Sequence, residues 1–170
     1  NITYSTSEEI TIDYMFYACM MLKSGAADGV VSGACHSTAN TLRPALQIVK
    51  TKPGSKIASA FFVIDVPNCE YGENGTFVFG DCGLNQNPNP EELAVIAVSS
   101  AESFRFLVGA EPKVAMLSHS SKGSAKHADV DKVVEATRIA KELAPELKLD
   151  GELQTDAAIV PSVGASKAPG

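Results

Sequence analysis

Short apolar runs alternate with helix-like segments along this chain of 170 residues, and this order limits the fold more than any other feature. The strand-like runs lie at residues 28–33, 57–65, 76–79 and 113–117. Helical patterns cover residues 41–50, 91–108 and 128–144, and the segment 147–160 is mixed. Strands separated by helices favour parallel pairing, whereas the loop at residues 67–75 favours an antiparallel hairpin. The sequence therefore predicts an α/β fold with a layered, mostly parallel sheet.

Two helix boundaries can be predicted near the beginning of the chain. Thr6 and Glu9 have the spacing of a capping box, which predicts a helix that runs to about Gly25. The second helix is expected to begin at Thr41, with Pro44 in its first turn, where a missing N–H costs little. Helical spacing predicts that one face of the first helix packs into the core: Ile10, Tyr14, Tyr17, Ala18 and Met21.

The turn at residues 52–55, Lys-Pro-Gly-Ser, is the best candidate for a boundary between lobes. We expect residues 1–54 to form part of a first lobe and residues 55–170 to form a second α/β lobe. The chain begins at Asn1 without a methionine and ends at Gly170 without a recognisable terminus, so we expect it to be part of a longer protein.

Composition excludes several classes of partner. The net charge of −6 and the pI of about 5.0 argue against nucleic acid. No apolar run reaches the roughly 18 residues of a membrane span. A core of this size needs no disulfide, so we expect the four cysteines to be reduced thiols in a cytoplasmic protein. They form no C-x-x-C pair, so we expect no metal site.

The first candidate site is the segment 32–43, which follows a strand-like run and precedes a helix. Glycine lets the backbone approach a ligand, hydroxyl groups suit phosphate oxygens, and the guanidinium of Arg43 can hold an anion with two hydrogen bonds. Arg43 is one of only three arginines in the chain. The alternative is that the hydroxyl residues only cap a helix and that Arg43 is a solvated side chain.

The second candidate is the loop at residues 118–126, which is rich in serine, lysine and glycine. Its composition resembles that of a backbone anion nest, although Lys122-Gly123-Ser124 has the wrong order for a P-loop. A solvated basic loop is the alternative. Nucleophile elbows and zinc-protease motifs are absent, and adjacent residues such as Cys35 and His36 rarely orient toward each other. The acids at residues 150, 152 and 156 could serve in binding or catalysis, or be ordinary surface charges.

Several of these segments together resemble the phosphate acetyltransferase family. The resemblance rests on Asp28-Gly29-Val30-Val31-Ser32-Gly33-Ala34, His36-Ser37, Thr41-Leu42-Arg43-Pro44, Ala58-Ser59-Ala60-Phe61-Phe62, Cys69-Glu70-Tyr71-Gly72, Lys113 to Ser118, Lys122 to Lys126, and Asp150 to Gln154 with Asp156 to Pro161. It runs over nearly the whole chain.

The resemblance implies reversible transfer of an acetyl group between coenzyme A and phosphate, which converts acetyl-CoA and phosphate into acetyl phosphate and free coenzyme A. It implies a fold like that of isocitrate and isopropylmalate dehydrogenases, a cytoplasmic homodimer and no cofactor, since coenzyme A is a substrate. It assigns a catalytic role to Arg43 and substrate binding to two groups of residues: Ser37, Thr38 and Thr41, and Lys122, Gly123 and Ser124.

The same resemblance implies that this chain is an internal fragment, since the family continues into a segment that carries further catalytic residues. No residue here can be assigned as the base toward the thiol, so we expect the fragment alone to be inactive. A phosphate butyryltransferase and a non-catalytic module that senses acyl-CoA or promotes dimerisation are the alternatives.

Overall fold

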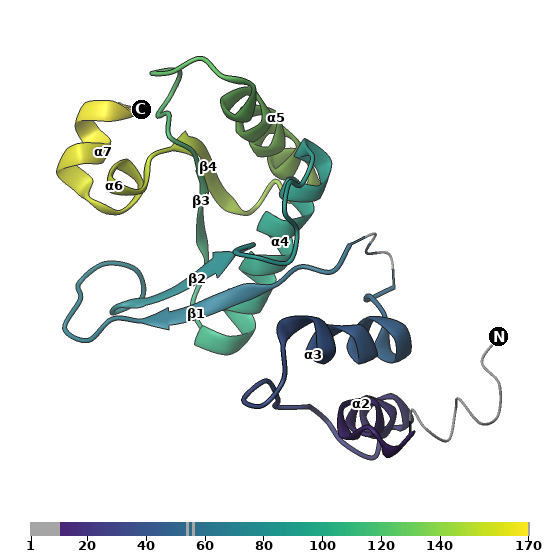
Figure 1. Ribbon diagram of the computed structural model, residues 1–170. Coiled ribbons are helices and arrows are strands. Elements are labelled where there is room, and N and C mark those ends of the chain that lie inside the picture. The colour runs from purple at the N-terminus through teal and green to yellow at the C-terminus, as the bar shows by residue number, and fades with distance from the viewer. Residues whose placement is uncertain (1–10, 54, 56, 170) are drawn as a thin grey trace. The chain divides into compact units, whose positions relative to one another are not determined.

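The computed structural model describes residues 11–53, 55 and 57–169, and these separate into two compact units. One unit extends to Ile57 and the other begins at Ala58. Figure 1 shows their elements in chain order, and each unit is described by itself. The chain has an α/β fold in which one strand pair is parallel and the other antiparallel. Its relation to the isocitrate dehydrogenase fold stays a prediction.

The described elements of the first unit are helical. Helix α2 (Tyr14–Ser24) begins after Asp13, whose carboxylate accepts hydrogen bonds from the backbone N–H groups of Met15 and Phe16. Helix α3 (Thr38–Pro44) continues into the π-helix η1 (Ala45–Val49). The predicted capping box at Thr6 and Glu9 lies outside the described residues.

Three predictions for this unit were wrong. Residues 28–33 form no strand, and the described part of this unit contains no other strand. The second helix begins at Thr38 rather than Thr41, so that Pro44 ends α3 instead of lying in its first turn. Helix α2 buries Met15 and Cys19, which are four residues apart, and leaves the predicted core residues Tyr14, Tyr17 and Met21 exposed.

The second unit contains the two sheets. Strands β1 (Phe61–Asp65) and β2 (Thr76–Gly80) form the predicted antiparallel hairpin. Strands β3 (Lys113–Leu117) and β4 (Lys148–Leu153) pair in parallel. Helix α5 (Ala128–Leu143) connects them, and α4 (Pro90–Val108) precedes β3. Short helices α6 (Thr155–Ile159) and α7 (Pro161–Lys167) follow β4.

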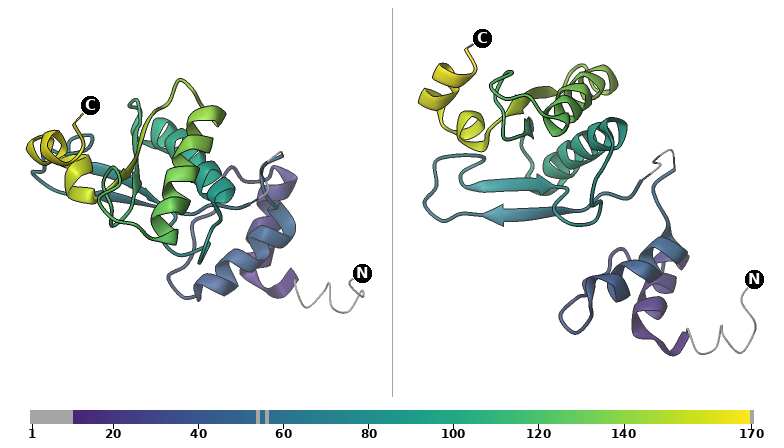
Figure 2. Two further views of the ribbon diagram at one scale, coloured as in Figure 1. Left: turned by 90° about the horizontal axis from the view of Figure 1, so that it is seen from above. Right: turned by 45° about the horizontal axis from the view of Figure 1, so that its top comes forward.

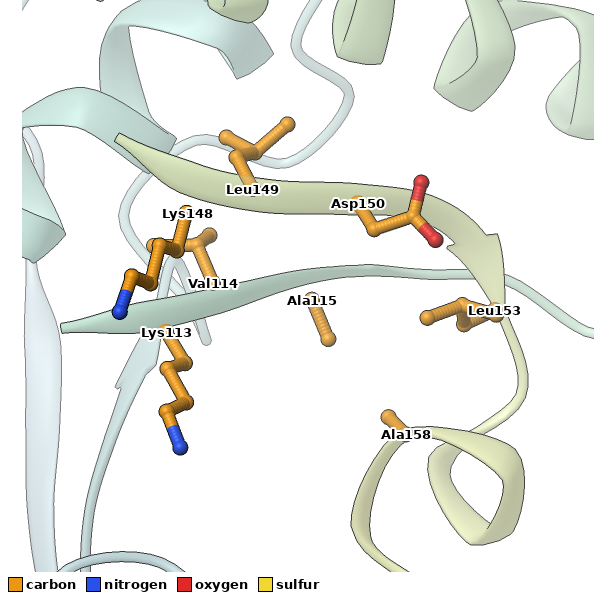
Figure 3. A pocket seen from close by; sticks show the side chains of 8 residues that line it. All are labelled: Lys113, Val114, Ala115, Lys148, Leu149, Asp150, Leu153 and Ala158. Carbon is orange, nitrogen blue, oxygen red and sulfur yellow. The ribbon is translucent and has the colours of Figure 1, made fainter. Parts of the chain in front are cut away.

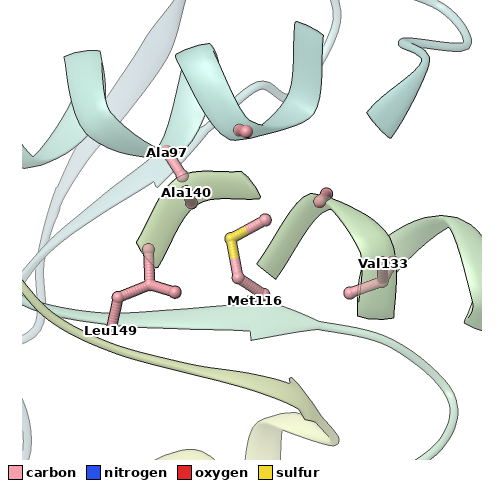
Figure 4. Packing of buried hydrophobic residues seen from close by; sticks show 7 residues of the cluster. Ala97, Met116, Val133, Ala140 and Leu149 are labelled. Atoms are coloured by element: carbon pink, nitrogen blue, oxygen red, sulfur yellow. The ribbon is translucent and has the colours of Figure 1, made fainter. Parts of the chain in front are cut away.

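Helices α4 and α5 lie side by side in both views of Figure 2 and cover one face of the β3–β4 sheet. Small residues make this close packing possible, because the helices meet at alanines such as Ala97 and Ala140. Figure 4 shows Met116 of β3 and Leu149 of β4 beneath these helices. The core therefore lies between the two helices and the parallel strands, and it holds the carboxyl ends of β3 and β4 at one edge.

Candidate functional site

The carboxyl ends of β3 and β4 carry a polar network built on residues 118–125, which we call the serine-rich loop. Since the strands are parallel, the loop that follows β3 lies against the last residues of β4. Ser118 N donates to Leu153 O (2.9 Å), and Lys122 N donates to Glu152 O (3.2 Å). Gln154 N donates to Ser121 Oγ (2.9 Å). The core packing of β3 and β4 thus fixes both sides of this loop.

Glu152 lies at the centre of this network and is only 4% exposed. Its Oε1 accepts a hydrogen bond from Gly123 N (2.7 Å) and another from Ser120 Oγ (2.9 Å). Burial alone would raise the pKa of Glu152, but hydrogen bonds from Gly123 N and Ser120 Oγ and the charge of Lys122 outweigh it and lower the pKa. The carboxylate is therefore ionised at neutral pH inside the protein.

Lys122 is held in a left-handed conformation (φ 47°) at the outer side of the serine-rich loop. Its Nζ donates to Asp150 Oδ1 (2.6 Å) and to Gly151 O (3.0 Å), and its side chain is 39% exposed. Lys141 Nζ also donates to Asp150 Oδ1 (3.4 Å). Burial raises the pKa of Asp150, but hydrogen bonds from Lys122 and Lys141 lower it overall. Lys122 and Lys141 thus both donate to the carboxylate of Asp150, and the ammonium group of Lys122 remains accessible to solvent.

A shallow pocket of about 350 Å³ lies on the face of the β3–β4 sheet opposite the core, beside α6. Figure 3 shows Lys113, Lys148 and Asp150 among its lining residues, together with Ala115 of β3 and Ala158 of α6. The two lysines stand at the amino ends of their strands, at the opposite end of the sheet from the serine-rich loop. This pocket is therefore separate from the polar network, apart from the shared residues Asp150 and Leu153.

A larger groove of about 690 Å³ lies between the β1–β2 hairpin, α4 and β3. Its lining is mostly apolar, and its charged members are three acids and one lysine: Glu73, Asp81, Glu111 and Lys113. Ser100 Oγ lines it as a buried hydroxyl without a hydrogen-bond partner among the described residues. An excess of carboxylates does not suit a phosphate group, so the groove does not compete with the two predicted anion sites.

The residues predicted from the segment 32–43 lie together on α3 in the first unit. Ser37 caps this helix and its Oγ accepts from Asn40 N (3.2 Å), while Thr41 Oγ1 donates to Ser37 O (3.2 Å). Thr38 is the first residue of α3 and is exposed, and Arg43 is exposed in its last turn. Within the described part of the chain, no carboxylate pairs with the guanidinium of Arg43.

The structure thus places the seven predicted site residues in two groups, one in each unit, and each group is compact in sequence. Lys122, Gly123 and Ser124 lie in the serine-rich loop of the second unit. Two residues of the polar network, Glu152 and Ser120, are not among the site residues predicted from the sequence. The available signal for Glu152 was an acidic residue between Gly151 and Leu153 at the end of a strand.

The chain belongs to the family described as phosphate acetyl/butaryl transferase, whose model matches residues 1–170. It is 60% identical over 169 residues to the phosphate acetyltransferase of Acetivibrio thermocellus, a match that covers 99% of this chain and 51% of that protein. A crystal structure of a phosphotransacetylase from Streptococcus pyogenes superposes with a TM-score of 0.88 at 49% identity, over 98% of this chain and 49% of that one. The EutD phosphotransacetylase of Staphylococcus aureus superposes with a TM-score of 0.84 at 45% identity, over 100% of this chain and 51% of that one.

The chain therefore spans about half the length of these relatives. Within residues 11–53, 55 and 57–169, the structure contains no helix with the length and apolar character needed to cross a membrane.

Proposed function

We propose that this chain contributes to a phosphate acetyltransferase, which transfers an acetyl group reversibly between coenzyme A and phosphate. The observation that carries this proposal is the family match over all 170 residues, together with 60% identity to a relative that is named for this activity. In the forward reaction a phosphate oxygen attacks the thioester carbonyl carbon, the carbon–sulfur bond breaks, and the thiolate of coenzyme A takes up a proton.

Arg43 is the residue proposed to act on the reacting groups. Its guanidinium is exposed on α3 and has no carboxylate partner among the described residues, so it is available to an external anion. Such a group can orient phosphate with paired hydrogen bonds and stabilise the oxyanion that develops on the carbonyl oxygen. Ser37, Thr38 and Thr41 would bind phosphate oxygens beside it. No side chain of this chain is assigned as the base.

Lys122, Gly123 and Ser124 are proposed to bind substrate from the second unit. The support is the solvent-accessible ammonium group of Lys122 and the fixed shape of the loop around it. The protein would need no cofactor, because coenzyme A enters and leaves as a substrate. The negative net charge and the free thiols are compatible with a cytoplasmic protein, and we propose that it works there as a homodimer.

The family description also includes butyryl transfer, so a phosphate butyryltransferase is a second candidate. The two activities differ in the length of the acyl chain that must be accommodated. Comparison of kcat/KM for acetyl-CoA and butyryl-CoA, at saturating phosphate, separates them. A preference for butyryl-CoA would replace the proposed function by this alternative.

The test uses a chimera in which this chain replaces the matching half of the Acetivibrio thermocellus enzyme, because that protein is 60% identical over the segment exchanged. We expect the chimera to form acetyl phosphate and free thiol from acetyl-CoA and phosphate, while the 170-residue chain alone does not. Arg43→Ala should lower kcat of the chimera by about 100- to 1000-fold. Arg138→Ala is the matched control, since that guanidinium pairs with Glu135 and Glu142 on the surface of α5.

A chimera that folds but transfers no acetyl group would contradict the proposed function and favour a non-catalytic module. Equal rates for the chimera with and without Arg43→Ala would remove Arg43 from the mechanism.

A further inference from the structure

Among the described residues, Glu152 is the buried one that carries a formal charge. A buried carboxylate is costly unless hydrogen bonds or opposite charges compensate it. Here the carboxylate lies at the edge of the sheet from which the serine-rich loop departs, and its hydrogen-bond donors come from that loop. The buried carboxylate of Glu152 is therefore compensated by the serine-rich loop and not by groups of the core.

A bulge in β4 directs this side chain toward the loop. Gly151 pairs with Met116 and Leu153 pairs with Leu117, so Glu152 is an extra residue opposite that step of β3. Without the bulge, the alternation along β4 would place Glu152 on the same face as Asp150. Bulges re-aim single side chains in this way and often occur near functional sites.

A directed chain of hydrogen bonds ends on Glu152. Ser120 has one hydroxyl hydrogen and donates it to Glu152 Oε1 (2.9 Å), so in its 3.4 Å contact with Ser124 Oγ it must be the acceptor. Ser120 Oγ also accepts from Ala125 N (3.1 Å). Loss of the carboxylate would thus release the Ser120 hydroxyl, and with it Ser124 and the start of the segment that leads to α5.

The loop makes a tight turn at the residue that contacts the carboxylate. Lys122 and Gly123 have successive positive φ angles of 47° and 80°, the left-handed conformation of such a turn. Gly123 N donates to Glu152 Oε1 at 2.7 Å, so the anion in this turn is the protein's own. The other N–H groups from Ser120 to Ala125 also donate to acceptors inside the second unit.

We propose that Glu152 is a positioning residue: its carboxylate serves as the internal anion of the serine-rich loop and presets the loop, which then meets substrate through the Lys122 ammonium group rather than through backbone N–H groups. The proposal rests on the proposed function for the substrate contact, but the fixing of the loop can be tested without it. It divides the roles within the proposed binding residues: the Lys122 ammonium group contacts an anionic substrate, whereas Gly123 N and Ser124 Oγ hold the loop through hydrogen bonds inside the protein.

The first test measures amide hydrogen exchange in the 170-residue chain by NMR. Glu152→Ala should accelerate exchange at Gly123 and Ala125 by about tenfold or more, because both N–H groups depend on the carboxylate directly or through Ser120. Glu152→Gln keeps an acceptor oxygen and should have a smaller effect. Glu146→Gln is the matched control, since Glu146 is exposed, and it should leave both amides unchanged. If Glu152→Ala does not fold, Glu152→Gln decides the test at Gly123, whose N–H contacts the carboxylate directly.

The second test measures steady-state kinetics in the chimera. Glu152→Ala should lower kcat/KM by about 100-fold, with a higher KM for the phosphate-bearing substrate, since a small misplacement of a binding group has a cost of this order. Val133→Ala, a core substitution on α5, should lower the melting temperature without changing KM. Glu152→Gln should lower kcat/KM less than Glu152→Ala does, because glutamine keeps an acceptor oxygen but lacks the negative charge.

The outcomes distinguish the two proposals. Unchanged exchange at Gly123 and Ala125 in both Glu152→Ala and Glu152→Gln overturns the internal-anion role, whether or not the chimera is active. Faster exchange with an unchanged KM overturns the link between the loop and substrate. An inactive chimera that carries no substitution counts against the proposed function and leaves the exchange result to decide the role of Glu152.

Discussion

Gly151 lies close to Met116 of β3 and Thr137 of α5, and substitution of this residue tests the packing beneath the serine-rich loop. A Cβ at this position would lie 2.5 Å from Met116 Cβ, 2.7 Å from Thr137 Oγ1 and 3.1 Å from Met116 O. Ordinary contacts between carbon atoms are about 3.5 to 4.0 Å, so the added methyl group would overlap atoms of β3 and α5 by about 1 Å. The first atoms it meets belong to buried residues that cannot swing away.

The expected cost follows from two opposing effects. Overpacking of a core by one carbon costs about 1 to 3 kcal/mol, and replacement of glycine by alanine restricts the unfolded chain and returns about 0.4 to 1 kcal/mol. Gly151→Ala should therefore lower the free energy of unfolding by about 1 to 2 kcal/mol. For a chain of this length, about 2 to 4 °C per kcal/mol gives a fall in melting temperature of about 2 to 8 °C.

Differential scanning calorimetry of Gly151→Ala beside Gly83→Ala provides the measurement. Gly83 has no atom within 4 Å of an added Cβ and no positive φ, so its substitution meets no clash, and restriction of the unfolded chain should raise the free energy of unfolding by about 0.4 to 1 kcal/mol. Equal melting temperatures for the two variants would refute the close packing of Met116, Gly151 and Thr137.

Three further results are expected. Asn89→Ala should lower the free energy of unfolding by about 1 kcal/mol in urea titrations, because Asn89 and Glu92 cap α4 reciprocally at 2.9 Å, and an unchanged midpoint would contradict this. The pKa values of Asp81 and Glu152 are lowered, because hydrogen bonds to each carboxylate outweigh the effect of burial. The stabilisation that these two ionised carboxylates give the folded protein is therefore complete above the ordinary carboxyl pKa and should be lost as the pH drops below about 4. Acid titration followed by circular dichroism can check this loss. Cys19, whose pKa is raised by burial, should react with a thiol reagent more slowly than the exposed cysteines, and equal rates would contradict its burial on α2.

Local signals in the sequence predicted most of the second unit. Helix α4 begins at Pro90 and ends at Val108, close to the predicted range, because acids in the first turn and Gly109 after the end mark its limits. Strand β3 has the predicted bounds Lys113–Leu117, because turn residues on both sides of the apolar run mark where the strand begins and ends. The antiparallel hairpin was also confirmed.

The first unit was harder to predict because its pattern is ambiguous. The apolar residues of α2 surround the helix, so spacing alone could not decide between the face with Tyr14 and the face with Met15 and Cys19. The Tyr14 ring instead packs edge-on against His36, with ring centroids 4.9 Å apart. A short apolar run at residues 28–33 resembles a strand only if a partner strand exists.

In the candidate site, local sequence patterns predict some residues, whereas others depend on contacts between distant parts of the sequence. Residues of the serine-rich loop could be singled out because serine, lysine and glycine cluster after a strand. The role of Glu152 depends on a bulge between β3 and β4 and on hydrogen bonds across about 30 positions of sequence, which no local pattern encodes. The roles of Arg43 and Lys122 in catalysis and binding stay predictions.

The rate of acetyl phosphate formation by the chimera, with and without Arg43→Ala, tests the central claim most directly. The account predicts phosphate-dependent release of free thiol from acetyl-CoA by the unsubstituted chimera, a loss of about 100-fold or more with Arg43→Ala, and no loss with Arg138→Ala. Thiol release that is independent of phosphate, or an equal rate in all three proteins, would contradict it.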